Sequence, residues 1–296
     1  MTSRAASPRV SVVIPAYDPG VELERAITSV LTQTMPDVEV VVLDDGSTED
    51  LSWVGRHADP RVRFERQPNR GVSVARNVAV GLARAPWIAF LDQDDVWHPA
   101  KLEKQLAAVE AGEVSFCCTG FHWMLPGRPP QPAHGEVSYL GMLRDQHVCL
   151  SSVLLSRDRY LAVGGHDPLL RIMQDYDLFL RLLRDGPDAI VVPEVLVDYH
   201  VHAANASRDY HSALVERRSI LRRHAWDARR RGRTDAERAV AAGLARTNQL
   251  FASQALEQAR QARHAGRLSD ALLHGWRSAR WDPKALGRAL AAHARG

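Results

Sequence analysis

Short apolar runs rich in β-branched residues alternate with amphipathic stretches over the first hundred residues. The apolar runs predict buried strands, because their length fits a strand and turn-forming residues bound them. These strands are expected at residues 9–14, 38–43, 62–64 and 87–91. Helical periodicity follows the first strand, with Leu23, Ile27 and Val30 on one face, and returns at about 73–83. Strands that alternate with helices predict an α/β fold, a mainly parallel, Rossmann-like sheet flanked by helices.

The pattern becomes less regular after residue 100 and purely helical after residue 210. Strands are expected at 114–118, 148–155 and 189–192, a helix at 175–183, and a Pro- and Gly-rich loop at 126–130. Beyond Tyr210 no strand pattern remains, and the helix formers Ala, Leu, Gln and Arg dominate. We expect three or more helices there, interrupted at Gly232, Gly266 and Pro283.

Composition indicates an ordinary globular protein without a membrane span. The chain has 296 residues, 45% of them hydrophobic and 25% charged, which excludes collagen-like, disordered and disulfide-scaffold proteins. No run approaches the roughly 18 apolar residues that a span requires, and Met1–Arg9 lacks the apolar core of a signal peptide. Cys117, Cys118 and Cys149 fit reduced packing residues rather than a zinc site. We therefore expect a soluble, cytoplasmic protein.

Charge divides the chain into two regions. Residues 1–216 carry 20 basic and 29 acidic side chains, whereas residues 217–296 carry 18 basic and 6 acidic ones. Eight arginines and one acid lie between Arg217 and Arg233, enough for a strong local field. Three functions fit this segment: contact with anionic lipid headgroups, binding of nucleic acid, or pairing with the acidic first region. We do not expect nucleic acid, because no recognition fold or interleaved aromatic platform accompanies the charge.

Polar side chains follow three of the expected strands, at the point where each strand ends. They are Tyr17, Asp44, Asp45, Asp92, Asp94 and Asp95. The carboxyl ends of parallel strands form one ligand-binding edge, so these side chains should converge. Carboxylates in one cleft repel each other, and oxygen ligands from Asp92 and Asp94, on one face of an extended strand end, suit Mn2+ or Mg2+. The alternative is a solvated turn that caps the helix expected near Pro99.

Four motifs in these segments, in this order and at this spacing, resemble the family 2 glycosyltransferases of the GT-A fold. They are Val12–Tyr17, Val42–Thr48, Asn69–Asn77 and Phe90–Trp97. The resemblance covers about residues 10–205 and implies a GT-A catalytic domain over 1–205. Its nucleotide-sugar-binding half would lie at about 9–98, and its acceptor and base half at about 99–205. Residues 206–296 would form a basic, helical C-terminal region.

The resemblance implies a role for each matching residue on the donor side. Residues of the first two motifs would contact the base and ribose: Pro15, Tyr17 and Asp45, with Asp44 close by. Arg76 would reach the base or the diphosphate, unless it is a surface arginine. Asp94 would ligate the metal that bridges the diphosphate, and Asp92 would contact ribose or metal. Asp95 is a candidate cap of the next helix, and Trp97 is expected in the core.

The resemblance also implies inversion of the anomeric centre, in which a carboxylate takes the proton of the acceptor hydroxyl. The family's Glu-Asp-x-Asp-Leu helix start matches Gln174–Leu178, which makes Asp175 the base and leaves Asp177 as the competing candidate. Gln174 replaces the usual Glu. Further along, His202 matches the histidine of the family's Tyr-Arg-x-His segment. It would ligate the metal or bind the diphosphate, unless it is an ordinary hydrogen-bonded histidine.

These assignments predict an inverting, non-processive glycosyltransferase. It would move a sugar from a nucleotide-diphosphate donor to a carbohydrate or lipid-linked acceptor, with Mn2+ or Mg2+, in cell-surface polysaccharide or glycoconjugate synthesis. The donor would be a UDP-sugar by family habit, with thymidine or guanosine nucleotides as alternatives. Processivity is not expected, because Arg277–Trp281, the nearest match to the family's Gln-x-x-Arg-Trp motif, lacks the Gln. The alternative from another class is a non-catalytic binding or scaffold protein on the same fold.

The C-terminal region suggests two further contacts. The basic helix at 217–233 would bring the protein to the anionic inner face of the membrane as a peripheral protein. Residues 258–286 vaguely resemble one helix pair of the tetratricopeptide type. A single pair cannot bury its own face, so it would pack on the catalytic domain or on a second copy in a homodimer.

Overall fold

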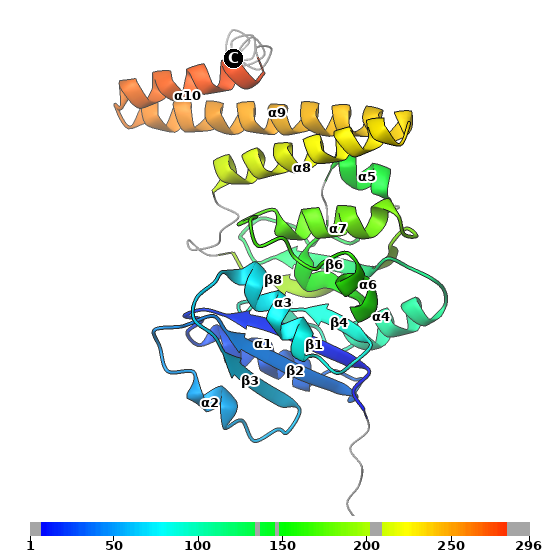
Figure 1. Cartoon of the computed structure of the whole chain (residues 1–296). Helices are drawn as coiled ribbons and strands as arrows, with labels where there is room; N and C mark the ends of the chain where they lie inside the picture. Colours follow the sequence, from blue (N-terminus) through cyan, green and yellow to red (C-terminus); the bar gives the residue numbers. More distant parts are fainter. Residues whose placement is uncertain (1–6, 134–136, 146–147, 202–208, 283–296) are drawn as a thin grey trace, which may run out of the picture. The chain divides into compact units, whose positions relative to one another are not determined.

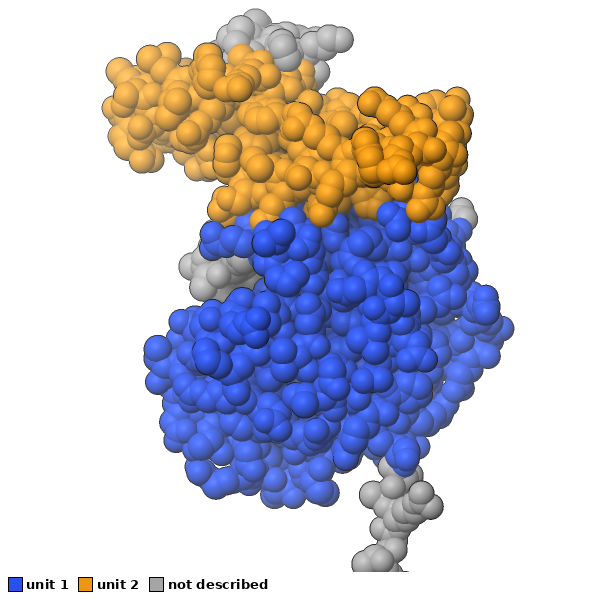
Figure 2. Space-filling model, in the orientation of Figure 1, with its two compact units in different colours: residues 1–142, 147–206 blue, residues 143–146, 207–296 orange. Residues whose placement is uncertain are grey.

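A computed structural model of the chain describes residues 7–133, 137–145, 148–201 and 209–282 (Figure 1). The chain divides into two compact units, which Figure 2 colours separately. Unit 1 comprises residues 1–142 and 147–206, and unit 2 comprises residues 143–146 and 207–296. Strands and helices alternate in unit 1, whereas the described part of unit 2 is helical.

Unit 1 is built on one eight-stranded sheet in the order β3-β2-β1-β4-β7-β6-β8-β5. Its strands are β1 (Val10–Ala16), β2 (Val38–Asp44), β3 (Val62–Arg66), β4 (Trp87–Phe90), β5 (Val96–Trp97), β6 (Cys117–Trp123), β7 (Val153–Ser156) and β8 (Ile190–Tyr199). β1 is parallel to β2 and β4, β2 to β3, and β6 to β8. β7 is antiparallel to β4 and β6, and β5 to β8. The α/β prediction is confirmed, and β1, β2, β4, β6 and β8 end at one edge of the sheet.

Helices cover the sheet of unit 1. They are α1 (Glu22–Leu31), α2 (Ser52–Gly55), α3 (Val72–Leu82), α4 (Lys101–Glu110), α5 (Tyr139–Arg144, whose last two residues belong to unit 2), α6 (Arg157–Ala162) and α7 (Gln174–Arg184). Leu23 and Ile27 of α1 and Leu102 of α4 share one hydrophobic core with Val12 and Val40 of the sheet. α3 packs against β1 and β2 as well, and its buried residues lie outside that core. Coverage of both faces explains why β1 and β2 are buried along their whole length.

Some predictions for the second half of unit 1 were wrong in detail. The segment expected as a strand at 148–155 begins as a 3-10 turn, η1 (Leu150–Ser152), and becomes β7 only at Val153. The hydroxyl of Ser152 donates to the carbonyl of Cys149 at 2.6 Å, a local bond that competes with strand pairing. The strand expected at 114–118 begins later and is longer, since β6 extends from Cys117 to Trp123. The strand expected at 189–192 extends to Tyr199 as β8. The two-residue strand β5 is too short to show a periodic pattern.

Unit 2 contains three helices over its described residues. They are α8 (Tyr210–Arg230), α9 (Thr234–His264) and α10 (Leu268–Trp281). The predicted breaks at Gly232 and Gly266 are confirmed, and both glycines have the positive φ, 66° and 73°, that favours glycine after a helix. The break predicted at Pro283 lies outside the described residues. Across the described part of the chain, no helix is both long and apolar enough for a membrane span.

Candidate active site

The end of β1 is tied to the acidic loop that follows β4. The backbone N–H of Tyr17 donates to Gln93 Oε1 at 2.8 Å, and Gln93 Nε2 donates to the carbonyl of Tyr17 at 3.2 Å. The Tyr17 side chain is 47% exposed, whereas Pro15 lies buried within β1. Tyr17 is therefore placed to contact a ligand at this edge, and Pro15 is placed to support the strand end.

Both acids of the turn after β2 organise the backbone around them. Asp44 is fully buried, accepts the N–H of Ser47 at 2.8 Å and lies 3.3 Å from Nε of Arg66. Asp45 is 4% exposed. Its carboxylate accepts Gln67 Nε2 at 2.7 Å and the backbone N–H groups of Arg70 and Gly71 at 2.9 and 2.8 Å. Asp45 therefore joins two of the four sequence motifs into one structure.

Arg76 is buried in the site rather than exposed on the surface of α3. The residue is 4% exposed, and its Nη2 lies 2.5 Å from Oδ1 of Asp92. Its Nε and Nη1 are also buried and have no hydrogen-bond partner within the described structure. The surface-arginine alternative is thus wrong. Buried N–H groups without a partner are unfavourable, and an anionic ligand beside Asp92 would satisfy them.

The acidic loop after β4 is not a solvated helix cap. Asp95 is fully buried and accepts the Ser151 hydroxyl at 2.5 Å and the backbone N–H of His200 at 3.0 Å. Burial, together with the charges of Asp92 and Asp94, raises the pKa of Asp95 well above its usual value. Gln33 bonds the first turn of α4 instead, since its Oε1 accepts the backbone N–H of Leu102 at 3.0 Å. The buried contact between Asp95 and Ser151 therefore stabilises the conformation of the loop, a role that the sequence analysis missed.

Asp175, the expected base, stands at the second position of α7. Burial raises its pKa to about 6, against the lowering effects of the Tyr176 backbone N–H and of Arg76, while Asp92 raises it further. Because Arg76 and Asp92 pair with each other and both act on the pKa of Asp175, α3, the loop after β4 and α7 meet at one site. Asp177, the competing candidate, is 3% exposed and pairs with Arg181 at 2.7 Å. Asp177 is therefore engaged within its own helix.

Comparison with known proteins identifies the family. Residues 11–150 match the family model described as glycosyl transferase family 2. The chain is 31% identical over 202 residues to the putative teichuronic acid biosynthesis glycosyltransferase TuaG of Bacillus subtilis. The matched region covers 66% of this chain and 79% of TuaG. The chain belongs to glycosyltransferase family 2.

Other relatives of this glycosyltransferase agree. It is 29% identical over 220 residues to WfaP of Escherichia coli, described as a UDP-Glc:alpha-D-GlcNAc-diphosphoundecaprenol beta-1,3-glucosyltransferase, with 72% of this chain and 85% of WfaP covered. Its fold resembles that of S. aureus TarS residues 1–349 in complex with UDP-GlcNAc, with a TM-score of 0.60, 15% identity and 90% of each chain covered. The GT-A type fold expected from the sequence is thereby confirmed.

Few protein ligands for a metal gather in the glycosyltransferase site. No group of three His, Cys, Asp or Glu side chains suited to a metal ion occurs among the residues that the structure describes. Asp92 and Asp94 supply carboxylate oxygens only, which fits Mn2+ or Mg2+ completed by phosphate oxygens and water. Whether His202 adds a ligand stays a prediction, because His202 lies outside the described residues.

Two further residues of the glycosyltransferase site have no role assigned from the sequence. The pKa of the Cys149 thiol is raised by burial and then by Asp95, Asp92 and Asp175, so the thiol lies among the acids of the site. Gln174, which precedes the expected base, is 8% exposed, and its Oε1 has no hydrogen-bond partner within the described structure. Neither stands within the donor motifs, and only the departure of Gln174 from the family's Glu marked it in the sequence.

Proposed function

We propose that this glycosyltransferase moves a sugar from a UDP-sugar to an acceptor hydroxyl by direct displacement with inversion, assisted by a divalent metal. The observation that carries the proposal is Arg76, a buried cation that pairs with Asp92, has two nitrogens without a hydrogen-bond partner among the described residues, and lowers the pKa of Asp175. This arrangement leaves an anion site next to a carboxylate whose pKa is raised by burial to about 6. Transfer of a sugar from a diphosphate requires both: a cation that binds the leaving diphosphate and a base that accepts the proton of the acceptor hydroxyl.

The donor would bind along the edge where β1, β2 and β4 end. Tyr17 and Asp45 would contact the base and ribose, while Pro15 and Asp44 shape the two strand ends. Arg76 would donate to the diphosphate. Asp94 and Asp92 would hold Mn2+ or Mg2+, with His202 as a further candidate ligand, and the ion would neutralise charge on the leaving diphosphate.

Asp175 would take the proton of the acceptor hydroxyl as the oxygen attacks the anomeric carbon. A base works best when its pKa lies near the working pH, and burial brings the pKa of Asp175 to about 6. At pH 7 the group is therefore mostly ionised and ready to accept a proton. One base and one displacement invert the anomeric centre. Asp177, held by Arg181, would support the helix instead of taking the proton.

The relatives support a donor and an acceptor class. The name of WfaP specifies UDP-glucose and a lipid-linked diphosphate sugar, and TarS has been solved with UDP and with UDP-GlcNAc. For this chain we infer a UDP-sugar donor and a carbohydrate or lipid-linked acceptor in cell-surface glycan synthesis. Such an acceptor would place the protein in the cytoplasm, at the inner face of the membrane.

Unit 2 carries features that suit peripheral contact with anionic lipid. On α8, Arg222, Arg223, Arg229 and Arg230 are exposed, and the guanidinium of Arg230 lies 4.6 Å above the ring of Trp226, itself 61% exposed. On α10 every fourth residue forms an exposed apolar stripe: Leu268, Leu272 and Trp276, exposed by 66, 76 and 59%. Exposed tryptophan, leucine and arginine are typical of helices that lie in a membrane interface.

Vesicle flotation would test the membrane contact. The protein should float with vesicles of phosphatidylglycerol and phosphatidylcholine but not with vesicles of phosphatidylcholine alone. The double variant Trp226→Ser/Trp276→Ser should float less than the wild type.

The alternative partner for the apolar stripe is a second copy of the chain. A dimer mass in light scattering that falls to the monomer mass in the same variant, without flotation, would favour that homodimer.

Release of UDP would test the transferase proposal. The purified chain is incubated with UDP-glucose or UDP-GlcNAc and Mn2+, with and without a GlcNAc-diphosphate-lipid acceptor. We expect UDP release that the acceptor accelerates and that EDTA abolishes, and NMR of the product should show a β-linkage from the α-linked donor. No release from UDP-, dTDP- or GDP-sugars would contradict the proposal and favour the scaffold alternative.

A further inference from the structure

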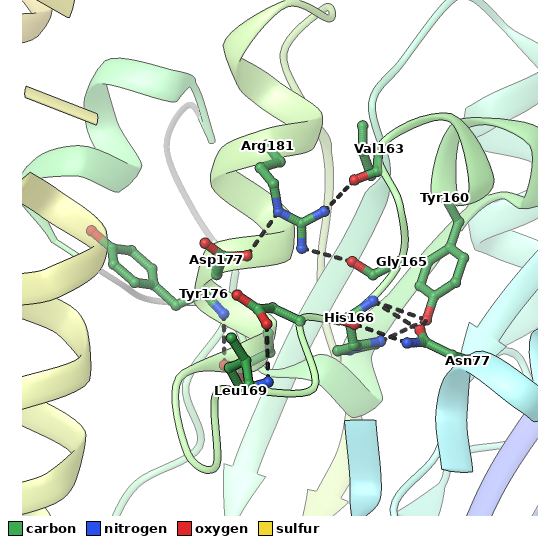
Figure 3. Close-up of polar contacts among 11 residues, drawn as sticks. Asn77, Tyr160, Val163, Gly165, His166, Leu169, Tyr176, Asp177 and Arg181 are labelled. Carbon is green, nitrogen blue, oxygen red and sulfur yellow. Dashed lines mark hydrogen bonds and ion pairs between the residues drawn. The ribbon is translucent and has the colours of Figure 1, made fainter. Parts of the chain in front are cut away.

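The segment between α6 and α7 has no regular secondary structure, yet it leads directly to Asp175. Residues 163–173 form turns and bends, so their backbone polar groups need partners from elsewhere in the fold. Asn77 of α3 and Arg181 of α7 supply several of them (Figure 3). The position of Asp175 therefore depends on contacts outside its own helix.

Asn77 uses both ends of its amide on the backbone of His166. Its Nδ2 donates to the His166 carbonyl at 2.8 Å, and its Oδ1 accepts the His166 N–H at 2.9 Å. The hydroxyl of Tyr160 donates to the same Oδ1. The preceding Gly165 has a φ of +67°, and a Cβ there would lie 2.5 Å from Asn77 Oδ1. The contact thus requires both the amide and the glycine.

The ring of His166 is buried beside Tyr160. The Tyr160 hydroxyl donates its hydrogen bond to Asn77 Oδ1, which leaves the Tyr160 oxygen to accept a hydrogen bond from His166 Nδ1, 2.8 Å away. Burial, with Arg76 and Arg181 nearby, lowers the pKa of His166 well below its usual value. The neutral ring packs against Phe90 and Tyr160, with centroids 5.3 and 5.6 Å away. His166, whose backbone Asn77 binds, is therefore itself fixed by packing in the core.

Arg181 connects the same segment to α7. Its Nη1 donates to the carbonyl of Val163 at 2.6 Å and its Nη2 to that of Gly165 at 2.7 Å, while its Nε pairs with Asp177 at 2.7 Å. Figure 3 shows Arg181 on one side of the segment and Asn77 on the other. The segment is thus held from α3 and from α7 at once.

We propose that Asn77 is a positioning residue that fixes this segment so that Asp175 faces the donor held by Arg76. The inference rests on the proposed transfer function. Arg76 and Asn77 are consecutive residues of α3, so one helix carries both the donor contact and the support of the base. A change at Asn77 should therefore lower turnover and spare donor binding, because Arg76 remains in place.

Hydrolysis of UDP-glucose and UDP-GlcNAc by the full chain, with water in place of the acceptor, tests whether a change at Asn77 lowers turnover without weakening donor binding. Asn77→Ala should lower kcat by roughly 10- to 100-fold, since a displacement of about 1 Å has effects of that order. The KM for the donor and the Kd for UDP should change by less than about twofold. Hydrogen exchange of residues 163–173 should become faster. Tyr160→Phe keeps both bonds from Asn77 to the His166 backbone but loses the hydroxyl that donates to Asn77 Oδ1, so kcat should fall by a smaller factor, about two- to tenfold.

Ser11→Ala is the matched control. It removes two buried hydrogen bonds, to Glu39 and from the N–H of Ala85, near the amino end of β1, and should leave kcat unchanged. An Asn77→Ala enzyme with wild-type kcat, or with UDP affinity reduced as much as kcat, would overturn the proposal. If that variant does not fold, an unchanged kcat in Tyr160→Phe would overturn it, and a reduced kcat with unchanged KM would support it. A wild-type chain that neither binds UDP nor releases it would contradict the proposed function itself, and this inference with it.

Discussion

The two units bury different kinds of side chain. Unit 1 buries many charged groups: Glu39, Asp44, Asp45, Arg76, Asp95, Lys101 and Asp177. In unit 2 the buried positions of α9 are mostly small and apolar, and its described arginines other than Arg217 are exposed or half-buried. A buried ion needs partners in fixed positions, so removing a partner is strongly unfavourable. Unit 1 should therefore lose function on small chemical changes, whereas unit 2 should respond mainly to changes in packing volume.

The largest expected effect comes from Asp175→Asn in unit 1. The amide has nearly the shape of the carboxylate but cannot take a proton, so turnover should fall by about 10²- to 10⁴-fold. Donor affinity should stay close to that of the wild type. UDP release and UDP titration on the same preparation measure the two effects. An unchanged rate would contradict the base assignment.

Asp94→Ala should act on donor binding instead. Loss of a carboxylate ligand should remove the metal-dependent part of UDP affinity, roughly 10²-fold or about 3 kcal/mol. Calorimetric titration with and without Mn2+ checks this. Asp59→Asn is the matched control, because Asp59 pairs with Arg61, which precedes β3, away from the acidic loop. Full metal-dependent binding in Asp94→Ala would rule out its role as a ligand.

The pH dependence of unit 1 follows from Asp175. Burial raises its pKa to about 6, and a carboxylate proposed as the base would act only when ionised, so the active fraction should be lost as pH falls through this value. Below it, kcat/KM should fall about tenfold for each pH unit. Above it, kcat/KM should level off. An acid limb that persists unchanged in the residual activity of Asp175→Asn would assign the titration to another group.

Gly243→Ala sharpens the comparison from the side of unit 2. A Cβ at Gly243 of α9 would lie 2.0 Å from the carbonyl oxygen of Leu143, so the free energy of unfolding of unit 2 should fall by about 1–3 kcal/mol. At Gly275 of α10 a Cβ meets nothing, and alanine there should stabilise by about 0.5–1 kcal/mol. Urea unfolding measures both. UDP release per folded molecule should be unchanged, and a large loss would contradict the division of roles.

The convergence of polar strand ends at one edge of the sheet could be predicted from the sequence because its signals are local. Asp44 and Asp92 each follow directly on a hydrophobic strand, and parallel strands bring such ends together. The bond between Tyr17 and Gln93 confirms that β1 and the loop after β4 meet. Asp175 needed the resemblance to the family, because nothing in its own pattern distinguishes it from Asp177.

The supports beneath the site could not be predicted, because they join residues far apart in the chain. Asp95 binds Ser151, 56 residues away, and Asn77 binds His166, 89 residues away. No periodicity links such pairs. The antiparallel course of β7 was hidden for the same reason, since pairing direction depends on the path of the intervening chain.

Titration of UDP into the purified chain, first with Mn2+ and then with EDTA, tests most directly the claim that unit 1 holds a nucleotide-diphosphate site around Arg76, Asp92 and Asp94. The account predicts micromolar binding that EDTA abolishes. Failure of UDP, dTDP and GDP to bind in the presence of Mn2+ would contradict it.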